Sequence, residues 1–395
     1  MKDFTQATQE FIRTHVNEDV RALALQAAKY PDVDMSAAVQ QIAGYQIASR
    51  KIPSWASVEQ IRYPRHLSME QCSSEQTARY KASLIKGDTL VDLTAGLGVD
   101  CSFLARNFKQ VTYVERQEEL CELAHHNFPL LGLPHITVCK DDACSFLENM
   151  KPVDCIFLDP ARRDSRGGKT VALADCEPNV IEMELLLISK AKTVMIKLSP
   201  MLDITSALHD LKYISQIHLV SVQNECKELL LILKSEQNNQ PVEIHCEQLI
   251  NKDCSNHFAF TVEEERNSPN NLADNILEYL YEPDVTLLKA GAYRILSSRF
   301  PVYKLHINSH LFTSSQYLSD FPGRHFQVVG VSGFGKKEIK LFLEGVEKAN
   351  LTVRNFPSTV TDLRKRLKLK EGGELYIFAT TLWNDEKVLI KCIKA

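Results

Sequence analysis

The sequence lacks several features that would place it at once in a familiar class. Its 11 cysteines include no C-x-x-C pair, so neither a disulfide framework nor a zinc knuckle is indicated, and free thiols are expected. No apolar run approaches the roughly 20 residues that cross a bilayer, and the polar start has no basic head before an apolar segment. Internal repeats and low-complexity tracts are absent as well. We therefore expect a cytoplasmic protein without membrane spans.

The composition is that of a folded protein with several domains. A chain of 395 residues with 44% apolar and 24% charged residues predicts two to four domains. The net charge of −4 is unevenly distributed, because Arg324 to Ala395 carries 14 basic against 8 acidic residues, whereas Met1 to Gly323 has a net charge of −10. A basic end of this kind often contacts nucleic acid, although a solvated basic helix is the commoner cause.

The pattern of apolar residues predicts helices first and then a parallel sheet. Helical spacing runs from Asp3 to about Ile85. After it, five short apolar runs alternate with helical stretches, namely TLVDL, VTYVE, ITVC, DCIFLD and TVMIKL. This alternation is typical of a Rossmann-like α/β sheet of parallel strands. The runs IHLVSVQ and ELLLILK are too close for a crossover helix, which predicts an antiparallel hairpin at the sheet edge.

Composition shifts divide the chain into four expected segments. Residues 1–75 form a helical region, residues 76–236 the α/β domain, residues 237–323 a small α+β module, and residues 324–395 a compact basic segment of two helices and four strands. Within the third segment, LADNILEYLY predicts a helix.

The first strand leads into a glycine-containing turn. Asp92 ends this strand, and Gly96 and Gly98 follow, where the lack of a side chain lets a ligand approach the backbone. A dinucleotide site would continue as G-x-G-x-x-G, but the third glycine is replaced by Cys101. The turn therefore indicates a ligand site but lacks the full dinucleotide fingerprint.

Acidic residues also end the next strands. Glu115 ends the second strand, where a carboxylate suits the two hydroxyls of a ribose. Asp142, followed by the small Ala143, suits an adenine amino group, and Asp159 ends the fourth strand. Each acid alone is more often a helix cap or a turn residue. Acids at three successive strand ends, Asp92, Glu115 and Asp142, together favour a cofactor site.

At these residues the sequence resembles the class I S-adenosylmethionine-dependent methyltransferases. DLTAGLG is similar to their glycine-rich first motif and LDPAR to their fourth motif. The resemblance implies a seven-stranded sheet with an antiparallel edge hairpin and S-adenosyl-L-methionine as cofactor. It implies cofactor contacts for Asp92, Thr94, Ala95, Gly96, Gly98, Glu115, Arg116, Asp142, Ala143 and Asp159.

A second resemblance covers nearly the whole chain. SMEQCSSEQTARYKA, DPARR, NECKELL, LTVRNFP and LRKRLKL are similar to an uncharacterised bacterial group with a ferredoxin-like module and a C-terminal THUMP-like domain. THUMP domains are associated with RNA-modifying enzymes, so the resemblance implies a transfer or ribosomal RNA substrate. It also implies that Ser74 and Glu75 contact the cofactor or the target, whereas the residues alone favour a helix N-cap.

Asp159 is the expected catalytic acid. It is placed to accept a hydrogen bond from an exocyclic amino group, and Pro160 would keep it rigid. Amino-directed nucleic-acid methyltransferases typically continue with Pro-Pro and an aromatic residue, but here Ala161 and Arg162 follow, and a guanidinium can itself stack on a base.

Basic residues are the candidates for RNA contact. Three lie in the loop ARRDSRGGK and two on the helix of LRKRLKL, where Leu363 and Leu367 are expected to face inward. These residues are Arg163, Arg166, Lys169, Arg364 and Arg366. A solvated loop and a solvated helix face are the alternatives.

The sequence predicts an S-adenosylmethionine-dependent methyltransferase that modifies a base nitrogen in RNA. A methyltransferase of proteins or small molecules and a catalytically silent RNA-binding scaffold are the alternatives, and an NAD-linked oxidoreductase fits less well. No metal is expected, because His306 and His310 have a metal-like spacing but neither an acid nor a third histidine beside them. The oligomeric state is not indicated.

Overall fold

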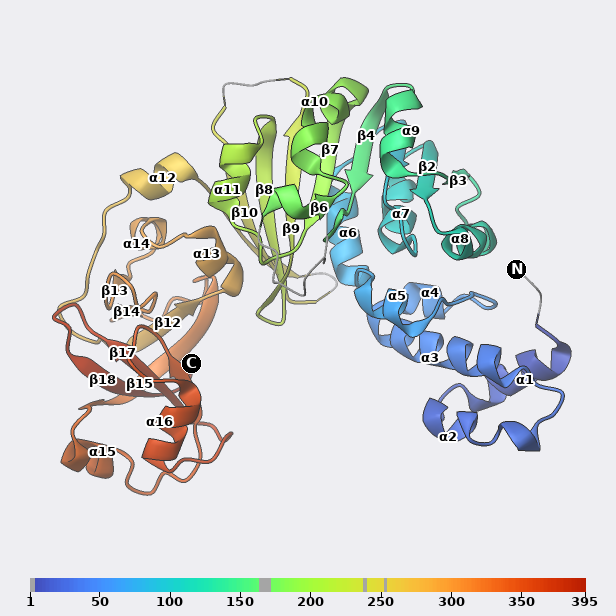
Figure 1. The fold of residues 1–395 in the computed structure, drawn as a ribbon. Coiled ribbons are helices and arrows are strands. Elements are labelled where there is room, and N and C mark those ends of the chain that lie inside the picture. The colour runs from blue at the N-terminus through green and yellow to red at the C-terminus, as the bar shows by residue number, and fades with distance from the viewer. Residues whose placement is uncertain (1–3, 163–171, 237–239, 252–253) are drawn as a thin grey trace. The chain divides into compact units, whose positions relative to one another are not determined.

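The computed structural model describes residues 4–162, 172–236, 240–251 and 254–395. It consists of two compact units (Figure 1). The first contains Met1–Ile217 and Glu228–Gln240, and the second contains His218–Lys227 and Pro241–Ala395. The chain therefore crosses between the units inside a hairpin as well as in the linker expected near residue 237. The four segments expected from the sequence stay a prediction.

The first unit begins with helices, as predicted. They are α1 (Gln6–His15), α2 (Val20–Ala24), α3 (Met35–Lys51), α4 (Pro53–Ala56), α5 (His66–Gln71) and α6 (Glu75–Leu84), with a short 3-10 turn at Ala27–Lys29. Trp55 of α4 is buried and donates a hydrogen bond from its indole nitrogen to Ser102 Oγ at 3.2 Å. Trp55 also shares a hydrophobic core with Val99 and Phe103 of the first α/β helix. The later N-terminal helices are thus packed onto the α/β part.

The sheet of the first unit has the predicted alternation of strands and helices. Its parallel strands lie in the order β7-β4-β1-β2-β3. These strands are β1 (Thr89–Asp92), β2 (Gln110–Glu115), β3 (Ile136–Lys140), β4 (Val153–Leu158) and β7 (Ala191–Leu198). The helices between and after them are α7 (Val99–Leu104), α8 (Glu118–Leu130), α9 (Ala143–Asn149), α10 (Val180–Lys190) and α11 (Ile204–Asp210). Shorter elements are β5 (Ala161–Arg162), β6 (Cys176–Glu177) and the 3-10 turns Ala105–Asn107 and Leu173–Asp175.

The predicted antiparallel hairpin is confirmed, but it does not lie at the edge of the sheet, because two later strands continue the sheet beyond it. It consists of β8 (Ile214–Val222) and β9 (Glu225–Lys234), and β9 pairs antiparallel with β7. The loop has two residues, Gln223 and Asn224, with φ of 53° and 59°. Two left-handed residues in a two-residue loop match the twist of the flanking strands. The tip of this hairpin, His218–Lys227, belongs to the second unit.

The second unit has two groups of strands. The hairpin of β10 (Glu243–Leu249) and β11 (Ser255–Thr261) follows β8 in the strand order, with β10 next to β8. A separate sheet has the order β13-β14-β12-β15-β18-β17-β16. Its strands are β12 (Tyr279–Pro283), β13 (Tyr303–Lys304), β14 (Phe312–Ser314), β15 (Gly323–Gly333), β16 (Asn350–Val353), β17 (Tyr376–Thr381) and β18 (Lys387–Lys394). The helices are α12 (Val262–Asn267), α13 (Val285–Ala290), α14 (Ile295–Arg299), α15 (Lys336–Phe342) and α16 (Val360–Leu367).

One predicted element of the second unit is wrong. The stretch expected as a helix at residues 272–281 contains the start of β12 instead. Leu280 is fully buried and pairs with Thr313 of β14 on one side and Phe326 of β15 on the other. Pairing with a strand on each side provides hydrogen bonds for the backbone here, and this outweighs the helical spacing of the apolar residues. The last segment has the expected two helices and four strands.

Candidate active site

The glycine-containing turn after β1 has the open backbone that the sequence predicts. Gly96 and Gly98 have φ of +56° and +83°, a region that favours glycine. A side chain at Gly96 would meet no atom within 4 Å, whereas one at Gly98 would lie 2.8 Å from the ring of Phe128. The amide of Ala95 donates to Val114 O at 3.0 Å and ties the turn to β2. Gly96 therefore borders open space, and Gly98 is needed for packing.

Glu115 holds this turn from the end of β2. Its Oε2 accepts a hydrogen bond from the Gly96 amide at 3.0 Å, and its Oε1 accepts one from the Gln117 amide at 2.9 Å. The side chain is buried. A carboxylate offers about four acceptor sites, and these two bonds occupy two of them. Glu115 can accept further hydrogen bonds from a ligand beside the turn.

Asp92 lies at the end of β1 with its carboxylate buried. Oδ1 accepts a hydrogen bond from the Thr94 amide at 3.3 Å, and Oδ2 has no hydrogen-bond partner among the described residues. Burial, and next the nearby carboxylate of Asp100, raise the pKa of Asp92 well above its ordinary value. A buried acceptor without a partner is costly, so Asp92 is a candidate to bind a donor group of a ligand.

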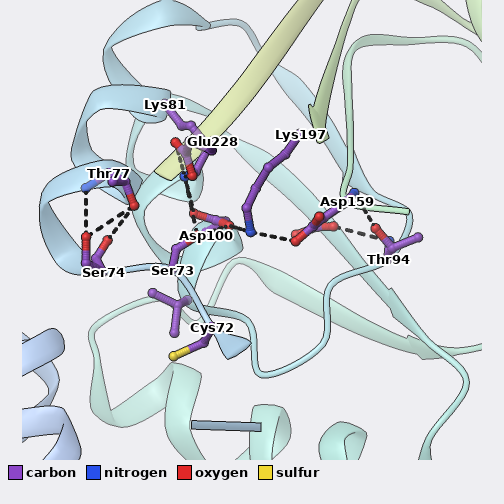
Figure 2. Close-up of polar contacts among 12 residues, drawn as sticks. Cys72, Ser73, Ser74, Thr77, Lys81, Thr94, Asp100, Asp159, Lys197 and Glu228 are labelled. Atoms are coloured by element: carbon purple, nitrogen blue, oxygen red, sulfur yellow. Dashed lines mark hydrogen bonds and ion pairs between the residues drawn. The ribbon is translucent and has the colours of Figure 1, made fainter. Parts of the chain in front are cut away.

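Asp159 follows β4 at the same edge of the sheet and is held from two sides (Figure 2). Its amide donates to Thr94 Oγ1 at 2.6 Å, and its Oδ2 lies 2.5 Å from the ammonium of Lys197 on β7. The side chain of Asp159 is 39% exposed, while Pro160 after it is buried. The carboxylate of the predicted catalytic acid is thus fixed in place and accessible to solvent.

A network of buried charges continues from Lys197. Asp100 lies 3.5 Å from Lys197 and 3.2 Å from Lys81, and it accepts a hydrogen bond from Ser73 at 2.7 Å. Lys81 in turn contacts Glu228 of β9 at 2.6 Å (Figure 2). Burial raises the pKa of Asp100, but Lys81 and Lys197 outweigh it, so the pKa lies below its ordinary value.

Other expected cofactor residues lie at the neighbouring strand ends. Asp142 follows β3 and caps α9, whose first residue is Ala143, by accepting the amides of Cys144 and Ser145 at 2.9 and 3.3 Å. Arg116, beyond Glu115, is exposed and forms an ion pair with Glu177 at 3.5 Å. The structure brings Asp92, Thr94, Gly96, Glu115 and Asp159 together at one edge of the sheet. The roles predicted for them stay predictions.

Ser74 and Glu75 have the contacts of a helix start. Ser74 Oγ accepts the amide of Thr77 at 3.3 Å and caps α6. Glu75 is buried, accepts the Ser54 amide at 2.8 Å and pairs with Arg79 at 2.7 Å. These contacts are those of a structural cap, and they leave the predicted substrate contact of this pair as a prediction.

The predicted basic residues fall in different parts of the structure. Arg163, Arg166 and Lys169 lie outside the described residues, and only the backbone of Arg162 is described, where β5 pairs with β6. On α16, Leu363 and Leu367 are buried as expected.

The two arginines of α16 that were predicted to bind RNA make contacts within the protein that the sequence does not indicate. Arg364 is partly buried and donates to Ala349 O at 3.3 Å, and the guanidinium of Arg366 lies 3.9 Å from the ring centre of Phe334.

Sequence reasoning missed Lys197, Lys81, Asp100 and Glu228. All four lie in or beside stretches that the sequence singles out: Lys81 in SSEQTARYKA, Glu228 in NECKELL, Lys197 in TVMIKL, and Asp100 after the glycine turn. Their pairing depends on contacts between distant elements. Elsewhere, the described part of the chain contains no group of three or more His, Cys, Asp or Glu side chains arranged to hold a metal ion. It also contains no helix that is long and apolar enough to span a membrane.

Known proteins share this architecture. A crystal structure of a presumed methyltransferase from Porphyromonas gingivalis W83 is 35% identical, with 98% of each chain covered and a TM-score of 0.88. Two uncharacterised S-adenosylmethionine-dependent methyltransferases from Mycobacterium tuberculosis are each 20% identical over 322 residues, which are 80% of this chain and 83% of theirs. The chain belongs to this methyltransferase family. Family models match the methyltransferase at residues 66–208 (conserved hypothetical protein 95), 279–322 (ferredoxin-like domain) and 323–394 (THUMP domain-like).

The residues of the methyltransferase fit S-adenosylmethionine, the cofactor of the family. Gly96 leaves open space beside the turn, Glu115 has acceptor capacity left, and Asp92 Oδ2 has no described partner. These features suit a ligand with ribose hydroxyls and an ammonium group. The enzyme class and cofactor predicted from the sequence are therefore confirmed.

Proposed function

We propose that this methyltransferase transfers the methyl group of S-adenosylmethionine to a base nitrogen in RNA. The position of Asp159 carries the chemical part of the proposal. Its carboxylate is partly exposed, is fixed by Thr94 and Lys197, and lies at the sheet edge beside the glycine-containing turn. A fixed acceptor at the mouth of a cofactor site suits a nucleophile that carries N–H groups.

The residues around the turn would hold the cofactor. Glu115 would accept the ribose hydroxyls, Asp142 the adenine amino group, and Asp92 the ammonium group, while Gly96 lets the ligand approach the backbone. The cofactor supplies a methyl group made electrophilic by a cationic sulfur. Our assignment of individual contacts follows the positions of these side chains at three strand ends.

Asp159 would act on the nucleophile. Its carboxylate would accept a hydrogen bond from the amino group, which directs the nitrogen lone pair away from Asp159 and toward the methyl group. The same negative charge favours the positive charge that develops on the nitrogen as the nitrogen–methyl bond forms and the methyl–sulfur bond breaks. S-adenosylhomocysteine would leave, and the methylated nitrogen would lose a proton to solvent. Pro160 is buried and restricts the backbone after the acid.

The THUMP-like part of the chain supports RNA as the substrate. Several basic side chains of α15 and α16 and of the residues after α16 are exposed, namely Lys336, Lys337, Lys340, Lys365, Arg366, Lys368 and Lys370. Phosphate contacts by such residues provide affinity without sequence specificity. The guanidinium of Arg366 lies over the ring of Phe334, a favourable cation–π contact, and the residue is exposed.

The test compares methylated nucleosides in ribosomal and transfer RNA from a deletion strain and its parent by mass spectrometry. We expect one methylated nucleoside to be missing from the deletion strain and restored by the wild-type gene. Asp159→Asn should not restore it. Asp154→Asn is the matched control, because Asp154 lies near the start of β4, away from Asp159, and the amide retains an oxygen for the amides of Asp88 and Thr89. Identical profiles from both strains, with cofactor binding confirmed, would contradict RNA as the substrate.

A second test addresses the RNA surface. Arg366→Ala should weaken binding of bulk transfer RNA and reduce the slope of log affinity against log salt by about 1. Lys109→Ala, at an exposed surface ion pair of the first unit, is the control and should leave the slope unchanged. An unchanged slope for Arg366→Ala would remove that residue from the interface.

A further inference from the structure

Lys197 lies at the meeting point of the candidate active site and the buried charge network. It is the second-last residue of β7, and β7 is the neighbour of β4, which carries Asp159 beyond its end. Figure 2 shows the Lys197 side chain pointing toward Asp159, between it and Asp100. The contact with Asp159 is 2.5 Å and that with Asp100 is 3.5 Å. The lysine side chain is only 14% exposed.

The surroundings keep this lysine charged. Burial lowers the pKa of Lys197, but the carboxylates of Asp159, Asp100 and Glu228 outweigh it and raise the pKa above its ordinary value. A buried ammonium is stable here because carboxylates surround it, and a charged donor makes the stronger type of hydrogen bond to Asp159.

The other members of the network have further partners besides Lys197. Glu228 has both carboxylate oxygens on Lys81, at 2.7 and 2.6 Å. Asp100 has Lys81 at 3.2 Å and Ser73 at 2.7 Å. The shorter of the two Lys197 contacts goes to Asp159, which is the more exposed of its two carboxylates. Lys197 therefore balances the charge of Asp100 and also holds the more exposed Asp159.

We propose that Lys197 is a positioning residue for methyl transfer, which holds the Asp159 carboxylate in the orientation that receives the substrate amino group. This inference rests on the role proposed above for Asp159. Thr94 fixes the backbone of Asp159 and Lys197 fixes its side chain, so the acid loses its rotational freedom before the substrate binds. Asp100, held by Lys81 and Ser73, fixes Lys197 in turn.

The experiment compares Lys197→Met with Lys192→Met. Lys192 is a matched control, because it lies on the same strand and pairs with Asp154 of β4 at 2.8 Å, at the other end of the sheet. Each purified protein is incubated with labelled S-adenosylmethionine and an extract of the deletion strain. Digestion by ribonuclease or protease identifies the labelled material. Binding of S-adenosylmethionine is measured separately by calorimetry.

We expect Lys197→Met to bind S-adenosylmethionine within about twofold of the wild type but to lower kcat by about 100-fold, because a small displacement of the acid is enough for such a loss. Lys192→Met should keep wild-type kcat. Lys197→Arg, which retains a cation, should recover part of the loss. Wild-type kcat in Lys197→Met would overturn the proposal.

A double variant separates positioning from a structural role. If Lys197 acts through Asp159, the variant with both Asp159→Asn and Lys197→Met should be no slower than Asp159→Asn alone. Losses that multiply would overturn the proposal. Label in protein instead of RNA would contradict the proposed substrate, yet the same comparison would still test Lys197.

A structural readout covers the case in which the extract takes up no label. Crystal structures of the wild type and Lys197→Met with S-adenosylhomocysteine should then differ in the rotamer or order of the Asp159 carboxylate. An Asp159 side chain that is equally ordered in the same place in both would overturn the proposal.

Discussion

Lys81 of α6 and Glu228 of β9 are 147 positions apart in the chain, yet their charged groups meet at 2.7 and 2.6 Å in a fully buried place. The pair joins the helix before the first strand to the hairpin of β8 and β9. Removing one partner of a buried ion pair leaves an uncompensated charge and typically costs about 3–5 kcal/mol. The pair thus connects the beginning and the end of the α/β part of the first unit.

Lys81→Met should strongly destabilise the first unit, by about 3–5 kcal/mol, because Glu228 would stay buried without its cation. The double variant Lys81→Met with Glu228→Leu should recover most of this loss, since Lys197 remains to balance Asp100. Urea unfolding followed by Trp55 fluorescence measures this in a Trp383→Phe background, because the chain has two tryptophans. A double variant as unstable as Lys81→Met would show that the loss arises elsewhere.

Gly96→Ala should weaken S-adenosylmethionine binding by about tenfold or more, since a methyl group would enter the open space beside the turn. Gly132→Ala is the control, because Gly132 also has a positive φ, +73°, and open surroundings but lies after α8. Both variants should lose a similar stability of about 1 kcal/mol. Calorimetric titration and thermal unfolding distinguish the two effects, and equal cofactor affinities in both variants would contradict the placement of the ligand.

Glu115→Gln should raise the Kd for S-adenosylmethionine by about 10- to 100-fold, because it weakens charge-assisted hydrogen bonds worth about 1.5–3 kcal/mol. The amide keeps one oxygen for the backbone of the turn, so the fold should be retained. Glu118→Gln is the control, since Glu118 is exposed and pairs with Lys140 at 2.8 Å. If both variants bind alike, Glu115 does not contact the ribose.

The second unit should lose stability in mild acid because of His218. Burial, with His245 and His257 nearby, lowers the pKa of His218 to about 3. The unfolded chain has an ordinary pKa of about 6.5 and so binds the proton first as the pH falls. Stability is therefore full above about pH 6.5 and decreases toward pH 3, with a loss of about 2 kcal/mol at pH 5.

Urea unfolding at pH 7.5 and pH 5 checks this through Trp383 in a Trp55→Phe background. His218→Phe should make the stability less dependent on pH in this range. A dependence unchanged by His218→Phe would assign the effect to other groups, of which His245 is the nearest, with its ring centre 4.4 Å away.

The main sheet could be predicted because its strands carry a local signal. Strands buried on both faces are continuous apolar runs, such as residues 229–233 of β9, and the short gap between β8 and β9 excludes a crossover. The strand β12 could not be predicted this way. Its neighbours β14 and β15 lie some 30 or more residues further along the chain, and their pairing decides its conformation.

The placement of a candidate site residue could be predicted when it depends only on the position of that residue at the end of its own strand. Asp92, Glu115 and Asp159 end apolar runs, and parallel strands end at one edge of a sheet. Lys197 also ends such a run, but its importance depends on β7 being next to β4, and the order of strands is not readable from their succession. The partners of Lys197 are Asp159, which follows β4, and Asp100 on α7, both far away in the sequence.

The hairpin of β8 and β9 limits where parts of this chain can be exchanged with those of a related protein. Residues 218–227 belong to the second unit, although residues on both sides of them belong to the first. A gene fusion joined in the linker near residue 240 would therefore leave the tip of the hairpin without its own partners, including Ser221, which bonds Asp284 at 2.9 Å. Because the chain passes between the two units both in the hairpin and in the linker, the catalytic and THUMP-like parts should be inherited together. A chimera should retain function only when the hairpin tip is exchanged with the C-terminal part.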